Sequence, residues 1–421
     1  FSSIDDRTVD AIDVYTGGFP ARYGNRMSGV IEVSTLKQAD KPGTEIGLSL
    51  LSLFANTRGS VGEDIDYLVS ARRGNLDFVV DQVDSKVGTP KYHDGYARVS
   101  HRLSDTASVY GGLFYTKDDV TLKDDEERSE SNIESLYGWA RLDLKPRPTL
   151  TSSTVFTYTT SDREKNEFAP EEEEESDQNA ATFLDYFQDH QKYQLRSDVS
   201  YQFGPQLMEF GVQLEYADSD YDVVAFIDRE DLGEILGIEE PLDFAFQRHP
   251  DGWSGGAYWS AELVFGRFIL QPGLRWDFQD YDPLGSTDHI SPRVGLKFSP
   301  VPSLTFRADY GRFHQPQGIH EMQVTDGVGQ FFPPQRSDHF IAGVEWLGLP
   351  DWEVRAEVYQ KKYRHTRLRF ENIFNPFVIL PELEPDRLGF QPTKARAFGA
   401  DLEVRRSFGD NVSTVMRYSY M

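Results

Sequence analysis

The sequence predicts an all-β protein, an antiparallel up-and-down transmembrane β-barrel. Apolar and polar residues alternate over stretches of about ten residues along most of the chain. Short turns alternate with long polar loops, and 13% of the 421 residues are aromatic. A strand places successive side chains on opposite faces, whereas a helix, with its period of 3.6 residues, cannot separate the two sets in this way.

The stretch 208–216 illustrates the alternation. One face carries Met208, Phe210, Val212, Leu214 and Tyr216, and the other carries Glu209, Gln213 and Glu215. Comparable stretches are 193–203, 268–279, 294–298, 304–310 and 352–358. Counting from 44–51 to 411–421 gives about seventeen strands, provided that 44–61 forms two strands with a tight bend near 51–55.

The connections between strands alternate in length. Turn-forming residues mark short connections at 62–64, 104–105, 145–148, 203–205, 265–267, 299–302, 348–350 and 408–410. Long polar connections lie between them, near 75–93, 118–133, 163–190, 228–252, 315–335 and 368–393, with a medium one at 281–289. An up-and-down barrel with this order has its tight turns at one rim and its long loops at the other.

Two architectures are compatible with the alternation. A soluble sandwich or propeller would bury the apolar face, whereas a membrane barrel turns that face toward lipid and encloses the polar face around a lumen. Strands of ~9–11 residues span a bilayer when tilted, and the asymmetry of the loops also favours the barrel. Aromatic residues near strand ends fit an interfacial girdle: Trp139, Tyr201, Phe203, Trp259, Trp276 and Trp352.

Composition excludes several classes of protein. The chain has no cysteine, so it forms neither disulfides nor thiolate metal sites. Its formal net charge of −26 argues against binding nucleic acid, because phosphate backbones require clustered lysine and arginine. A Ser-His-Asp triad can be assembled from this chain only by arbitrary choice. We therefore expect no enzyme, no catalytic residues and no cofactor.

The stretch 9–35 departs from the later pattern. Residues 12–14 alternate, Gly17-Gly18 forces a turn, Ala21-Arg22-Tyr23-Gly24 forms another, and Ser28-Gly29 precedes a short strand at 30–35. This order resembles the C-terminal end of the plug domain of TonB-dependent outer-membrane receptors, which closes with the same turns and a last strand ending in threonine. The stretches that follow resemble the first barrel strands of the same family.

The residue types in 9–35 have physical reasons. Gly17, Gly18, Gly24 and Gly29 permit a positive φ or a close approach of the backbone inside a packed lumen. Arg22 can pair with a carboxylate of the barrel wall, and we expect Glu209 or Asp277 as its partner. Taken singly, each glycine is also compatible with an ordinary hairpin turn.

The resemblance implies two domains. Residues 1–37 would be the C-terminal part of the plug, and residues 44–421 a partial barrel truncated at its C-terminus, with about seventeen of roughly 22 strands. It further implies a location in bacterial outer-membrane lipid and active uptake of a scarce nutrient, such as a siderophore, cobalamin, glycan or peptide. The TonB energy-transducing complex would be the partner, through a part of the plug outside this sequence.

Alternative functions remain open. A passive outer-membrane channel or an adhesin-like barrel would not be coupled to TonB, and an outer-membrane hydrolase would need a Ser-His pair on the wall. A passive pore has no use for a glycine-rich segment packed in its lumen, so the stretch 9–35 discriminates between the first two classes.

Two loops carry candidate binding residues. His314, His320, Phe331 and Phe332 could contact an iron chelate or stack on a ring, although their spacing matches no metal motif; a structured rim loop is the other interpretation. The acidic runs at 118–127 and 171–177 lack the order of a calcium-binding loop, so we expect solvated loops and no metal site. Ionisable residues of the inward face are expected to pair across strands.

Overall fold

The computed structural model describes residues 4–36, 42–75, 89–124, 127–169, 182–227, 242–282, 285–372, 387–409 and 412–421. These residues form strands almost throughout, with two short 3-10 helices, η1 (Asp6–Thr8) and η2 (Val324–Asp326). Neither helix is long or apolar enough to cross a membrane. The all-β prediction is therefore confirmed.

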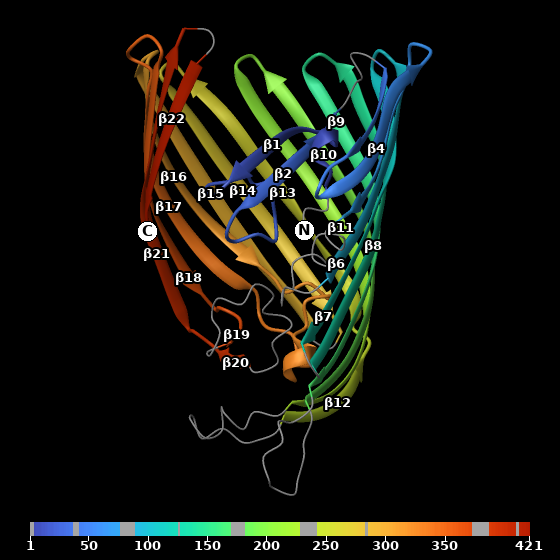
Figure 1. Ribbon diagram of the computed structural model, residues 1–421. Coiled ribbons are helices and arrows are strands. Elements are labelled where there is room, and N and C mark those ends of the chain that lie inside the picture. Colours follow the sequence, from blue (N-terminus) through green and yellow to red (C-terminus); the bar gives the residue numbers. More distant parts are fainter. Residues whose placement is uncertain are drawn as a thin grey trace, which may run out of the picture.

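One large antiparallel sheet curves round as a barrel (Figure 1). Its first strands are β3 (Gly43–Leu48), β4 (Ser52–Val61), β5 (Ile65–Gly74), β6 (Thr89–Ser104), β7 (Ala107–Asp124), β8 (Glu127–Arg147), β9 (Leu150–Ala169), β10 (Thr182–Phe203) and β11 (Gln206–Ile227). The others are β12 (Leu242–Arg248), β13 (Asp251–Phe265), β14 (Phe268–Tyr281), β15 (Gly285–Val301), β16 (Leu304–Gln315), β17 (Gln335–Trp346), β18 (Trp352–Arg364), β21 (Lys394–Phe408) and β22 (Val412–Tyr420). Paired strands follow one another along the chain, as in an up-and-down topology, except that β13 pairs with β11 beyond β12, and that β19 and β20 lie between β18 and β21.

The number of strands agrees with the prediction. β12 pairs with residues 221–227 of β11, and β13 pairs with residues 207–218 of the same strand. The two therefore form one line along β11, interrupted at His249 and Pro250, because proline cannot donate a ladder hydrogen bond. Counting them as one strand reduces the eighteen strands of the sheet to seventeen.

The wall has two unpaired edges. No strand pairing among the described residues joins β22 to β3, although the two strands end the ladder at its opposite sides. All nine residues of β22 are exposed. We therefore describe the sheet as a barrel-shaped wall that is open between β22 and β3.

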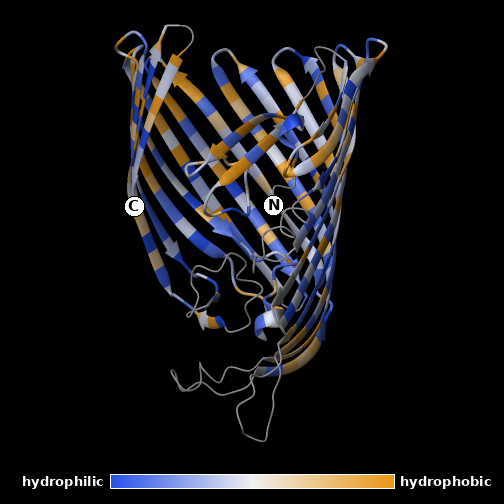
Figure 2. Ribbon diagram, viewed as in Figure 1, coloured by the Kyte–Doolittle hydropathy of each residue, from blue (hydrophilic) through white to orange (hydrophobic). Residues whose placement is uncertain are grey.

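The apolar face of the sheet points outward. Phe210 on β11 and Leu274 on β14 each expose 47% of their surface, whereas the charged Arg275 and Asp277 of β14 expose 2%. Orange and blue residues alternate along the strands that form the back wall (Figure 2). This is the arrangement of a membrane barrel, and the soluble sandwich, in which the apolar face would be buried, is excluded.

Two of the predicted loops are wrong. β7 and β8 pair as far as Asp124 opposite Glu127, and β9 and β10 pair as far as Ala169 opposite Thr182. The polar stretches 118–133 and 163–190 are therefore mostly strand, because the hydrogen bonds of a ladder join backbone groups and do not require apolar side chains. The predicted loop residues 76–88, 228–241 and 373–386 and the whole acidic run 171–177 lie outside the described residues.

Two small sheets stand apart from the wall. β1 (Val9–Tyr15) pairs with β2 (Val30–Thr35), and β19 (Arg369–Asn372) pairs with β20 (Arg387–Phe390). Residues 4–36, which we call the lumenal segment, lie within the barrel (Figure 1). The Thr35 hydroxyl is 2.9 Å from the Tyr96 hydroxyl of β6, and the opposite side of the segment accepts hydrogen bonds from β14, β15 and β18.

Candidate functional site

The turns of the lumenal segment are held by cations of the barrel wall. Residues 16–28 lie between β1 and β2 and form no strand, so their carbonyl groups need other donors. Arg293 on β15 donates to the carbonyls of Phe19 at 2.9 Å and Tyr23 at 2.8 Å, and also to that of Pro20. Arg275 on β14 lies 3.4 Å from the carbonyls of Ala21 and Arg22.

Lys361 is the third wall cation that binds carbonyl groups of the turns. This residue of β18 donates to the carbonyl of Thr16 and, at 3.3 Å, to that of Ser28. Because Thr16 and Ser28 lie at the two ends of the turn region, one ammonium group joins them. We call Arg275, Arg293 and Lys361 the cationic clamp.

An aromatic contact completes the anchoring of the turns. The ring of Phe19 lies 4.3 Å from that of Phe313 on β16, and both side chains are fully buried. The Arg293 guanidinium lies 5.0 Å from the Phe19 ring and 4.4 Å from the Phe313 ring. A cation over aromatic faces is stabilised by the ring quadrupole, so the same arginine binds both backbone and side chain.

Gly24 shows why the turns require glycine. A Cβ at this position would overlap the guanidinium of Arg275, which lies directly against the backbone. Gly18 has a positive φ of 60°, and a Cβ at Gly29 would lie 2.6 Å from the carbonyl oxygen of Tyr15. A Cβ at Gly17 would lie 3.0 Å from Ile341 Cδ1 of the wall. The structure thus shows both reasons that the sequence suggests for these residues, positive φ and close approach.

The predicted partner of Arg22 is wrong. Arg22 Nη2 lies 2.9 Å from Glu32 Oε2, within the lumenal segment, and the Tyr23 hydroxyl also donates to Glu32. Burial, together with this hydrogen bond, raises the pKa of Tyr23 above its ordinary value. The antiparallel pairing of β1 and β2 brings Glu32 back over the turn, a proximity that spacing along the sequence does not reveal.

The wall carboxylates have other partners. Glu209 accepts a hydrogen bond from Ser260 at 3.1 Å, and Asp277 lies 2.6 Å from Arg275 Nη2. Several wall pairs join residues two apart on one strand: Arg196–Asp198, Arg275–Asp277 and Arg307–Asp309. The expected cross-strand pairs are present as well, such as Arg307–Glu357 at 3.6 Å and Arg72–Asp94 at 2.7 Å. Residues two apart share a face, so the side chains meet without reaching another strand.

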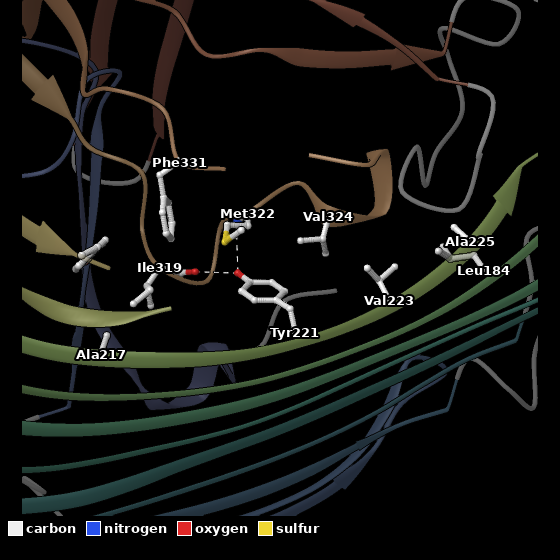
Figure 3. Packing of buried hydrophobic residues seen from close by; sticks show 10 residues of the cluster. Leu184, Ala217, Tyr221, Val223, Ala225, Ile319, Met322, Val324 and Phe331 are labelled. Carbon is white, nitrogen blue, oxygen red and sulfur yellow. Dashed lines mark hydrogen bonds between the residues drawn. The ribbon is translucent and has the colours of Figure 1, made fainter. Parts of the chain in front are cut away.

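The loop between β16 and β17, residues 316–334, folds against the inner wall. Its residues Ile319, Met322, Val324 and Phe331 join a buried apolar cluster with Tyr221 of β11. The Tyr221 hydroxyl donates to the carbonyl of Ile319 at 2.8 Å and accepts from the amide of Met322 at 3.3 Å (Figure 3). The loop is thus attached to a distant strand and narrows the lumen on the side of the long loops.

The four predicted contact residues lie in or beside this loop, at separate places. The His320 ring lies 4.6 Å from that of His190 on β10, tilted by 35°, and Phe331 is buried 5.8 Å from Tyr281. The His314 ring lies 4.4 Å from that of His289, tilted by 44°, and the amide of Phe332 donates to Gln317. Burial lowers the pKa of His320 to about 4. A role in ligand contact stays a prediction, but the four side chains do not form one surface.

Two kinds of chemical site can be compared with the described part of the chain, a metal-binding group and a nucleophile on a sharp turn. No group of three or more His, Asp or Glu side chains there is arranged to hold a metal ion. Residues 252–256 have the spacing G-x-S-x-G, but Ser254 lies within β13, and not on the strand-to-helix turn that exposes a nucleophile. Its hydroxyl lies 3.4 Å from Glu215.

Comparisons with solved structures support the fold. The outer membrane transporter YddB from Escherichia coli superimposes with a TM-score of 0.66 at 12% identity, over 99% of this chain and 65% of that one. The ferripyoverdine receptor of Pseudomonas aeruginosa gives 0.71 at 12% identity, over 98% of this chain and 60% of that one. BauA, the ferric preacinetobactin receptor from Acinetobacter baumannii, gives 0.65 at 13%, over 98% and 67%. At such identities the similarity shows the fold alone.

The chain spans 65% of the length of the first of these structures and 60% of the second. No curated protein sequence matches it. A family model, described as "TonB dependent receptor-like, beta-barrel", matches residues 54–421. Proteins of this family are receptors and transporters of the bacterial outer membrane, which is the location of this chain. The match covers nearly all of the wall, and the chain belongs to the TonB-dependent receptor family.

Proposed function

We propose that this chain is part of a receptor that takes up a scarce nutrient across the outer membrane with energy supplied through TonB. Residues 1–37 would be the C-terminal part of its plug, and residues 44–421 part of its barrel. The observation that carries the proposal is the lumenal segment, which lies inside the barrel and is bound by the cationic clamp. A passive channel would gain nothing from such an obstruction.

The chemistry of the clamp supports a plug that can be displaced. A hydrogen bond from a charged donor contributes ~1.5–3 kcal/mol, and the clamp places its contacts on separate carbonyls between Thr16 and Ser28. A mechanical pull on the segment can break such contacts one after another, and water in the lumen can replace each donor. Phe19 provides the only fully buried aromatic anchor among the described residues of the segment.

The nutrient would enter from the side of the long loops, which is extracellular in barrels of this type. The loop 316–334 narrows the lumen there, so it would form one side of the entrance. We propose that His314, His320, Phe331 and Phe332 contribute to ligand binding by shaping this loop. Two of the compared structures are receptors of ferric siderophores, so a siderophore is the first class to test, before cobalamin, glycans and peptides.

Growth experiments test the proposal. A strain lacking the full-length protein is grown on defined sources of iron, cobalamin, glycan and peptide, each as the limiting nutrient. We expect loss of growth on one source, and the same loss when the protein is present but TonB is absent. Growth on every source without the protein, or uptake that is independent of TonB, would contradict the proposal.

The alternative of a passive channel or an adhesin-like barrel is tested separately. The full-length protein is reconstituted in liposomes, and swelling is measured with small sugars. The lumenal segment should keep the conductance close to that of protein-free liposomes. Rapid swelling without TonB would favour the passive channel.

A further inference from the structure

The outer face of the barrel carries opposite charges on its two sides. On β11 and β13 the outward aromatic pair Tyr216 and Trp253 is followed, toward the long loops, by Asp218 opposite Asp251. On β16 and β17 the corresponding aromatic pair is Tyr310 and Phe340, and the next residue of β16 on the same face is Arg312. The acidic side matches the net charge of the chain, and the basic side is the exception.

The basic side consists of two neighbouring cross-strand rows. The strand registers place Arg312, Asp338, Lys362 and Arg396 in one row across β16, β17, β18 and β21. The next row toward the long loops contains Arg336, Arg364 and Lys394. Six cations and one carboxylate therefore occupy adjacent positions, and we call these seven residues the basic patch.

The basic patch faces outward. On β17 the residues of the patch lie on the same face as Phe340, which exposes 44% of its surface. The alternate residues Ser337 and His339 are fully buried. The Lys362 ammonium lies 5.3 Å from the ring centroid of Phe340. Successive residues of a strand point to opposite faces, so the cations share the face that meets the membrane.

Most of the positive charge is not neutralised. Asp338 pairs with Arg312 at 2.8 Å and with Arg336 at 2.7 Å. Within the described ranges, no carboxylate lies within 4.0 Å of the charged groups of Lys362, Arg364, Lys394 or Arg396, which are exposed residues. The patch can therefore accept an anion with more than one charge.

An apolar groove lies directly beside the patch, toward the middle of the membrane. The row next to the cations contains Tyr310, Phe340, Gln360 and Phe398, and the row after that contains Ala308, Ala342, Val358 and Ala400. The small side chains of the second row leave a groove of ≈ 650 Å³ between the larger ones. The basic patch thus lies directly beside a shallow apolar groove that runs along the strands.

We propose that the basic patch and this groove bind a phosphorylated glycolipid of the outer leaflet, lipid A, with its phosphates on the cations and an acyl chain in the groove. The patch lies at the extracellular end of the apolar band, where the headgroups of that leaflet lie. Arginine and lysine form charge-assisted hydrogen bonds with phosphate oxygens. The acidic residues on β11 and β13 would repel the phosphates on the other side of the barrel. The inference depends on the outer-membrane location and not on the proposed transport.

Binding of purified lipid A to the full-length protein in detergent tests this inference. The variant Lys362→Gln/Arg364→Gln/Arg396→Gln removes half of the cations, and we expect its affinity for lipid A to fall at least about tenfold. The matched control Lys145→Gln/Arg147→Gln/Arg267→Gln removes three exposed cations near the tight turns and should bind as the parent does. Lipid A without its phosphates should bind the parent as weakly as lipid A binds the first variant.

A second variant keeps all the charges. Inorganic phosphate should compete weakly with lipid A for the cations of the basic patch. Ala342→Trp fills the groove, so it should weaken binding of lipid A, whereas the affinity for inorganic phosphate should stay unchanged. Equal affinities of the parent and the triple variant, equal affinities for lipid A with and without phosphates, or an equal loss in the control variant would each overturn the proposal. The circular dichroism of the strands shows that each variant is folded before binding is measured.

Discussion

The guanidinium of Arg293 lies 5.0 Å from the ring centroid of Phe19 and donates a hydrogen bond of 2.9 Å to the carbonyl of the same residue. A wall residue and a lumenal residue separated by 274 positions in the sequence thus hold each other by both side chain and backbone. This relationship makes Arg293 the central member of the cationic clamp.

Replacing Arg293 by alanine should loosen the lumenal segment while the barrel remains folded. The variant loses charged hydrogen bonds to Phe19, Pro20 and Tyr23, each worth ~1.5–3 kcal/mol. Hydrogen exchange of the amides in 16–28 should become at least about tenfold faster. Arg293→Lys should be intermediate, because it keeps the charge but not the fork of donors. Unchanged exchange in the alanine variant would show that the clamp does not hold the segment.

Gly24→Ala should have a similar local effect by a different route. The added Cβ would overlap the guanidinium of Arg275 and displace it from the carbonyls of Ala21 and Arg22. Limited proteolysis of the segment should be faster in this variant. The control is Gly95→Ala on β6, where an added Cβ meets nothing within 4 Å. If proteolysis of the segment were equally slow in both variants, the close approach of Arg275 to Gly24 would be contradicted.

The loop 316–334 should open more readily as the pH falls. Burial lowers the pKa of His320 to about 4, from an ordinary value of 6.5. Between these two pH values His320 is protonated when the loop is open and neutral when the loop is closed. The closed loop therefore has its full stability above pH 6.5, where His320 is neutral in both states. Its stability relative to the open loop decreases as the pH falls from 6.5 toward 4. The positive charges of Lys192 and Arg163 act in the same direction as burial, and Glu321 opposes it.

The measurement is hydrogen exchange of the loop at pH 7.5 and pH 5, corrected for the intrinsic rates. The lower pH should increase the opening by roughly thirtyfold. In His320→Gln the side chain cannot take up the proton, so this increase should become smaller. An identical increase in the variant would assign the pH dependence to other groups, such as His190.

The barrel could be predicted from the sequence because its signal is local. Alternation between neighbouring residues, as in Phe210 against Glu209, decides which face meets lipid, and the structure confirms it at Phe210 and Leu274. The extent of the strands beyond the membrane could not be predicted in the same way. Around Asp118 and Glu164 both faces carry polar residues, so hydrophobic periodicity disappears while the backbone ladder continues.

The contacts of the lumenal segment were harder to predict. The glycines at 17, 18, 24 and 29 indicated a close approach, but the sequence contains no signal that pairs Arg293 with Phe19 or Lys361 with Thr16. Such contacts depend on the curvature of the wall and on the position of the segment within it. The partner of Arg22 was wrong for the same reason, since Glu32 reaches it only through the hairpin of β1 and β2.

The most direct test of the account asks which face of β11 meets lipid. The chain has no cysteine, so single cysteines at 209, 210, 212, 213, 214 and 215 can carry a nitroxide label in the reconstituted protein. Labels at 210, 212 and 214 should be accessible to oxygen, which is concentrated in lipid, and those at 209, 213 and 215 to a water-soluble nickel chelate or shielded by the lumenal segment. The reverse pattern, with oxygen reaching 209, 213 and 215, would contradict the account.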